Sequence, residues 1–110
     1  MRIFEVKGAL KGPGEYILGA KQTGSHACYL IWGVLGPGEQ GRALEPGEGH
    51  EELLLALKGA LEVSGHFEGL LQEGQALHLK GSERCWLGNP SGTEEALYVI
   101  AGGHSQGHGH

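Results

Sequence analysis

The sequence predicts an all-β protein in which short antiparallel strands form a sandwich or a barrel. Three observations favour this fold class: apolar runs of strand length, glycine- and proline-rich breaks between them, and the share of glycine. Glycine contributes 22 of the 110 residues. Because glycine and proline favour tight turns, runs punctuated in this way are typical of antiparallel sheets.

Eight apolar or alternating runs are predicted as strands, and each is bounded by residues that favour turns. The breaks are Gly-Pro-Gly at 12–14 and again at 36–38, Pro-Gly at 46–47, single glycines at 74 and 81, and Asn-Pro-Ser-Gly at 89–92. In chain order, the predicted strands are residues 3–6, 16–18, 28–35, 52–57, 60–64, 75–79, 85–87 and 96–101.

Residues 51–61 are the one segment that a helix would also suit, because Glu, Leu, Ala and Lys are good helix formers. Gly59 interrupts the segment, and residues 60–64 alternate between apolar and polar side chains. We therefore interpret the region as a hairpin of two strands, in which context overrides propensity.

Length and charge limit the classes of function. The chain has the length of one domain, with 39% hydrophobic and 19% charged residues, which is a globular balance. The longest nearly apolar stretch, residues 27–35, is far shorter than the ~20 residues that a membrane-spanning helix needs. The net charge is −5 and the basic residues are scattered. We expect neither a membrane nor a nucleic acid as partner.

The sequence also suggests how the chain is organised and where it works. We expect one domain over residues 1–101 and a flexible Gly- and His-rich tail over residues 102–110. The N-terminus shows no apolar signal segment, so a cytoplasmic location is expected. All thirteen acidic residues are Glu and Asn89 is the only Asn, a bias that favours a thermophilic source.

Two segments resemble the cupin family. Residues 74–90, GQALHLKGSERCWLGNP, follow the family's second motif in length and frame, with Asn89 where the family has its asparagine. Residues 45–63 resemble the back half of the first motif, since Glu52 and Gly59 keep the glutamate-to-glycine spacing. The two motifs and their linker cover about two-fifths of the chain. The resemblance implies a jelly-roll barrel, also called a double-stranded β-helix, which agrees with the predicted strands.

The sequence departs from the family pattern at the metal site. Cupins usually bind a metal with two histidines and a glutamate from the first motif and a histidine from the second. Two alignments to the first motif are possible, and they place either Glu45 and Gly47 or Pro46 and Glu48 where the family has its two histidines. In the second motif, Cys85 stands where the family has its histidine. Only Glu52 is kept. The resemblance therefore supports the fold but not a particular cupin activity.

A rewired ligand set is one interpretation of these departures. Glu48, His50 and Glu52 follow at every second position, so an extended backbone points all three to one side, with Cys85 on a facing strand. These donors suit a divalent transition metal such as Zn, Fe, Mn or Ni. The alternative is that Gly47 and Gly49 place the first two in a loop and that Cys85 is a small core residue.

Three functions stay open at this level. The first, which we favour, is a small cupin-like protein that binds a small molecule inside the barrel, with or without a metal. The second is a metal-dependent dioxygenase- or isomerase-like enzyme that uses the altered ligands. The third is metal handling by the C-terminal histidines, 104, 108 and 110. Candidate pocket-lining residues are Trp32, His78, Trp86 and Tyr98.

A homodimer is expected, because homodimers are the commonest oligomers. Small cupins often pair through an N-terminal strand, so residues 1–6 are the segment expected to pair.

Overall fold

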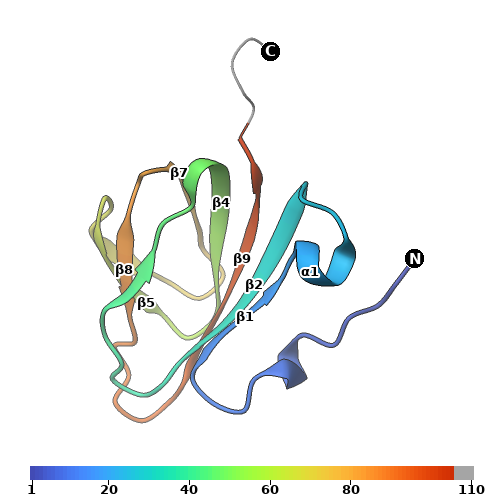
Figure 1. The fold of residues 1–110 in the computed structure, drawn as a ribbon. Coiled ribbons are helices and arrows are strands. Elements are labelled where there is room, and N and C mark those ends of the chain that lie inside the picture. The colour runs from blue at the N-terminus through green and yellow to red at the C-terminus, as the bar shows by residue number, and fades with distance from the viewer. Residues whose placement is uncertain (106–110) are drawn as a thin grey trace.

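The computed structural model describes residues 1–105, which form two antiparallel sheets that face each other (Figure 1). The five-stranded sheet has the order β1-β2-β9-β4-β7 and the four-stranded sheet the order β3-β8-β5-β6. The strands are β1 (Gly14–Leu18), β2 (Cys28–Leu35), β3 (Arg42–Leu44), β4 (Gly47–Lys58), β5 (Leu61–Gly65), β6 (Gly69–Leu71), β7 (Ala76–Gly81), β8 (Cys85–Gly88) and β9 (Ala96–His104).

Two short helices complete the described part of the chain, η1 (Lys7–Ala9) and α1 (Ala20–Thr23). Neither has the length or the apolar character to cross a membrane. The all-β, jelly-roll prediction is confirmed.

Seven of the eight predicted strands are present. Residues 51–61 are strands rather than a helix, as predicted, but the predicted hairpin is wrong because β4 and β5 lie in different sheets. β4 and β5 pair with different neighbours but are joined through Gly59, whose φ of +78° lies in the left-handed region. The predicted strand at residues 3–6 is wrong: these residues pair with no strand and extend away from the sheets, with Ile3 92% exposed. β3 and β6 were not predicted because each has only three residues.

The hydrophobic core lies between the two sheets. Because side chains alternate along a strand, every second residue of β4, β7 and β9 points inward. The five-stranded sheet contributes Leu35, Leu54, Tyr98 and Ile100, and the four-stranded sheet contributes Leu61, Leu87 and Cys85, all buried. This filled interior decides where a ligand has room.

β9 continues three residues beyond its predicted end. Gly102 pairs with Tyr29 of β2 and with Glu52 of β4, and His104 pairs with His50. Residues 102–104 therefore belong to the sheet, because backbone pairing on both sides holds them, and the expected start of the tail is corrected to a later position. Residues 106–110, including the other two tail histidines, lie outside the described residues.

Candidate functional site at one end of the barrel

The four predicted metal ligands are spread over the end of the barrel and its core. Glu52 points inward from β4 and is only 5% exposed. His50 is half-buried and Glu48 is exposed on the same strand. Cys85 is fully buried in the core on the opposite sheet. Within residues 1–105, no three His, Cys, Asp or Glu side chains come together in a group that could hold a metal ion.

The donors present do not fit the metal centre that the cupin resemblance implies. The Oε2 atom of Glu52 accepts a hydrogen bond from the Tyr29 hydroxyl. Glu45, at one of the candidate histidine positions, pairs with Arg84 at 3.3 Å. Cys85 packs among leucines, where a thiol behaves as a small hydrophobe. A transition-metal site needs three or four converging donors, and the described residues do not form such a group here.

The four pocket candidates do not share a cavity. Trp32 and His78 project from the outer face of the five-stranded sheet, and Trp86 from the outer face of the other sheet, where each borders a surface hollow. The alternation along β2, β7 and β8 causes this, because their neighbours fill the core. Tyr98 does point inward, but its ring fills the interior over Gly33. The expectation that these four line one pocket inside the barrel is therefore corrected.

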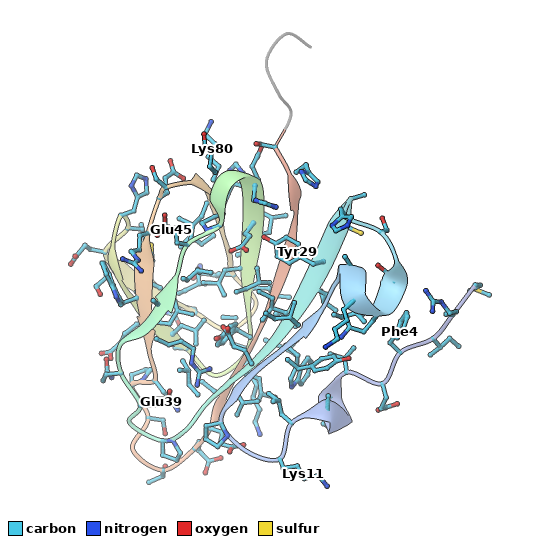
Figure 2. The ribbon with its side chains drawn as sticks, in the orientation of Figure 1. Phe4, Lys11, Tyr29, Glu39, Glu45 and Lys80 are labelled. Atoms are coloured by element: carbon cyan, nitrogen blue, oxygen red, sulfur yellow. The ribbon has the colours of Figure 1, made fainter. Side chains whose placement is uncertain are left out.

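The structure instead brings together Tyr29, Gly102 and Glu52 from three adjacent strands. Gly102 lies between the other two in the register, on the inner face of the sheet. A Cβ atom at Gly102 would collide with the Tyr29 ring, so glycine lets the ring cross β9 and reach Glu52. Figure 2 labels Tyr29, which projects from β2 toward the strands beside it.

Glu52 is the one side chain of this group that has a buried polar atom without a hydrogen-bond partner. Its Oε1 atom is buried and has no hydrogen-bond partner. An unpaired buried polar atom costs about 1–3 kcal/mol, and more when it is charged. Native proteins rarely keep such an atom without a reason. Glu52 Oε1 can therefore still accept a hydrogen bond, and none of the protein's described side chains supplies the donor.

The environment shifts the acid–base properties of both side chains. Burial raises the pKa of Glu52 above its ordinary value, the Tyr29 hydrogen bond opposes this shift, and the charge of Glu15 adds to it. Burial also raises the pKa of the Tyr29 hydroxyl, and so does its hydrogen bond to Glu52. Tyr29 is therefore a hydrogen-bond donor at physiological pH, and Glu52 is an acid whose charge is costly.

Two histidines form the rim above this pair. The His50 and His104 rings have centroids 5.1 Å apart, and the His50 ring meets Tyr29 edge-on at 6.0 Å. His50 also lies within 3.2 Å of the Glu48 carbonyl oxygen through its Nδ1 atom. An open hollow of about 620 Å³ lies at this end of β4 and β9 on the outer face of the sheet, with Leu53, His78 and Ala101 in its lining, whereas the Glu52 side chain points to the inner face.

The sequence reasoning identified His50 and Glu52 but did not place Tyr29 or Gly102 beside them, and it assigned His104 to the tail. The missed signal is a repeated pattern. Residues 29–33 read Tyr-Leu-Ile-Trp-Gly and residues 98–102 read Tyr-Val-Ile-Ala-Gly. Recognising this repeat would have extended the last strand to Gly102 and paired the two tyrosines with the two glycines.

The structure is similar to solved cupin-fold proteins. One is the TT1209 protein of Thermus thermophilus, with a TM-score of 0.70 and 22% identity over 94% of this chain and 98% of the other. An RmlC-like cupin from Shewanella frigidimarina has a TM-score of 0.60 and 11% identity over 74% and 70% of the two chains. An oxalate oxidase in complex with the substrate analogue glycolate has a TM-score of 0.69 and 15% identity over 84% and 51%.

These similarities define the class of fold: the chain has the double-stranded β-helix fold of cupin-type proteins. No family model and no curated protein matches the sequence itself. Cupin-fold proteins include enzymes such as oxalate oxidase, so the fold alone does not assign an activity. The function has to be argued from the site.

Proposed function

We propose that the protein binds a small polar molecule at the end of the barrel formed by Tyr29, His50, Glu52 and His104. The observation that carries this proposal is the buried, unpaired Oε1 atom of Glu52. A ligand that hydrogen-bonds to this atom would remove the cost of leaving it unpaired. The filled core limits the ligand to this end rather than to the centre of the barrel.

The rim supports a small ligand in a second way. His50, His104 and Tyr29 present three rings around the buried carboxyl, and binding sites commonly combine such surfaces with a few polar groups. Oε1 itself is closed to solvent, so entry requires the rim side chains to move aside. His104 is exposed and ends its strand, which makes it the side chain with most freedom to do so.

Metal-dependent catalysis is the less favoured function. The arrangement of donors in residues 1–105 is the reason, since Glu52, His50 and Cys85 do not converge. Metal handling by the tail depends on two histidines outside the described residues and receives no support from the site.

The experiment is a fragment titration followed by amide and side-chain NMR. Small neutral, cationic and anionic polar fragments are added separately to the wild-type protein and to Glu52→Gln. Glu95→Gln is the matched control, because Glu95 is exposed and directly precedes β9, at the opposite end of that strand.

We expect at least one fragment class to shift the resonances of Tyr29, His50, Gly102 and His104 in the wild type and in Glu95→Gln. In Glu52→Gln the same shifts should be absent, or the affinity that they report should be about tenfold lower, because one strong hydrogen bond is removed. If no fragment shifts these four residues, or if Glu52→Gln binds as well as the wild type, the proposed site is wrong.

A further inference from the structure

The five-stranded sheet contains the same side-chain arrangement twice, related by a local two-fold axis. In the pairing of β2 with β9, Ile31 lies opposite Ile100, and rotation about this pair exchanges Tyr29 with Tyr98 and Gly33 with Gly102. The flanking strands follow the same symmetry: Glu15 of β1 pairs with Gly33, and Glu52 of β4 pairs with Gly102.

Each copy is therefore a tyrosine that crosses a glycine on the next strand and donates to a glutamate on the strand beyond. Tyr98 crosses Gly33 and donates to Glu15. Tyr29 crosses Gly102 and donates to Glu52. The two copies can be compared group by group, because their local geometry is shared.

The copies differ in burial, since Glu15 is exposed and Glu52 is buried, and in one component, a cation. At the Glu15 end, the Arg42 guanidinium reaches across from β3 and donates to the Tyr98 hydroxyl at 3.2 Å. Arg42 also pairs with Glu39 at 2.8 Å and donates to two backbone carbonyls, so this copy is complete. At the other end, the described residues place no Lys or Arg in a salt bridge with Glu52, and its Oε1 atom is unpaired.

We propose that the ligand of the Glu52 end is a small organic cation, a guanidinium or primary ammonium group, which supplies there the charge that Arg42 supplies at the Glu15 end. This inference rests on the proposed binding function and names its ligand class. The cation donates to Glu52 Oε1, while the Tyr29 hydroxyl keeps Oε2.

The surroundings match a cation in charge and in surface. The chain carries a net charge of −5, and Glu48 lies on the same strand as Glu52, four residues before it. The rings of Tyr29 and His50 lie beside the carboxyl, and an aromatic face attracts a cation within about 6 Å. A single carboxylate with ring walls suits an organic cation better than a metal ion, which requires several converging donors.

The test compares methylguanidinium with N-methylurea, which has nearly the same shape but no charge, at constant ionic strength. Acetate is the anionic probe. Dissociation constants are measured by NMR shift titration of Gly102 and Tyr29 in the wild type, Glu52→Gln and Glu15→Gln. Glu15→Gln is the matched control because it makes the identical change in the symmetry-related copy.

We expect methylguanidinium to bind the wild type at least about tenfold more tightly than N-methylurea, since a charge-assisted hydrogen bond is about twice as strong as a neutral one. The preference should disappear in Glu52→Gln and persist in Glu15→Gln. Tyr29→Phe provides a second variant if Glu52→Gln does not fold: it keeps the carboxylate and should keep the preference.

Two results would overturn the inference. If N-methylurea or acetate shifts the same residues as strongly as methylguanidinium does, the ligand class is wrong while the proposed site stands. If none of the three probes shifts Gly102 or Tyr29, and the fragment titration is also negative, both the ligand class and the site are wrong.

Discussion

Glu52 and Glu15 occupy matching positions in the five-stranded sheet, but their environments are opposite. Glu15 is exposed and Glu52 is 5% exposed, although each accepts a hydrogen bond from a tyrosine. The groups facing Glu52 are Tyr29 from β2, His50 from its own strand, His104 from β9 and, further away, Glu15 from β1. None of these is a lysine or an arginine, so burial dominates and raises the pKa of Glu52.

A dependence of stability on pH follows at the residue scale. The ordinary pKa is 4.5 and the folded-state pKa is higher, so the folded protein binds this proton more tightly than the unfolded chain does. The free energy of unfolding contributed by Glu52 therefore falls as pH rises from 4.5 through the folded-state pKa and is constant above it. The side chain of glutamine does not titrate, so the Glu52→Gln variant does not lose stability in this way as pH rises.

We expect the stability of Glu52→Gln relative to the wild type to increase as pH rises above the ordinary pKa of 4.5, measured by urea unfolding at several pH values. Glu95→Gln should show no such gain. A constant difference between Glu52→Gln and the wild type across these pH values would mean that Glu52 is not perturbed by burial.

At the scale of elements, the site exists because β9 carries a glycine, Gly102, where the Tyr29 ring must cross. The substitution Gly102→Ala places a methyl group in the space of the Tyr29 ring. Such overpacking costs about 1–3 kcal/mol. It would also displace Tyr29 from Glu52.

We expect Gly102→Ala to lower the free energy of unfolding by that amount and to weaken ligand binding. Gly92→Ala is the control: Gly92 has an ordinary φ and nothing within 4 Å of the added atom. Its change should stay within about 0.5 kcal/mol in urea unfolding. Equal stability of the two variants would show that Tyr29 does not need Gly102.

The elements also show what the sequence allowed us to predict. Long apolar runs with turn residues at both ends identified β2, β4 and β9, because burial on one or both faces leaves a clear pattern. The three-residue strands β3 and β6 leave no such pattern. Residues 3–6 look like a strand, but no strand lies beside them to provide hydrogen bonds.

The candidate site was predicted only in part for a related reason. Glu52 was recognised through the family spacing, but its partner Tyr29 is 23 residues away and joined to it through Gly102. The register in which β2 and β4 pair with β9 determines the contact between Tyr29 and Glu52. Glu52 of the first motif and Cys85 of the second both stand at ligand positions of the family, but their surroundings differ, because Cys85 packs against leucines and Glu52 against a hydroxyl.

At the scale of the whole molecule, the outer face of the five-stranded sheet carries an apolar patch. Its exposed or half-buried side chains are Leu30, Trp32, Leu53, Leu57 and Val99. Five strands that average eight residues span about 24 Å by 26 Å, or roughly 600 Å². A stable dimer buries about 800 Å² per partner, so this face together with the extended residues 1–6 has nearly the required area.

A homodimer therefore stays our prediction, with a mass in light scattering of twice the 11.6 kDa chain. Leu53→Glu should shift the protein toward the monomer, because it places a charge on this face, where Leu53 is 52% exposed. Leu70→Glu is the matched control, since Leu70 is 48% exposed on the other sheet. A monomeric wild type at micromolar concentration would contradict the prediction.

The central claim is that the Glu52 carboxyl binds the ligand's cation, and the most direct measurement follows that carboxyl itself. The side-chain carboxyl carbons of Glu52 and Glu15 are followed by NMR in a pH titration, with and without methylguanidinium. We predict that Glu52 titrates above its ordinary pKa of 4.5 and that the probe lowers this pKa, while Glu15 is unchanged by the probe. A Glu52 carboxyl whose titration does not respond to the probe would contradict the claim.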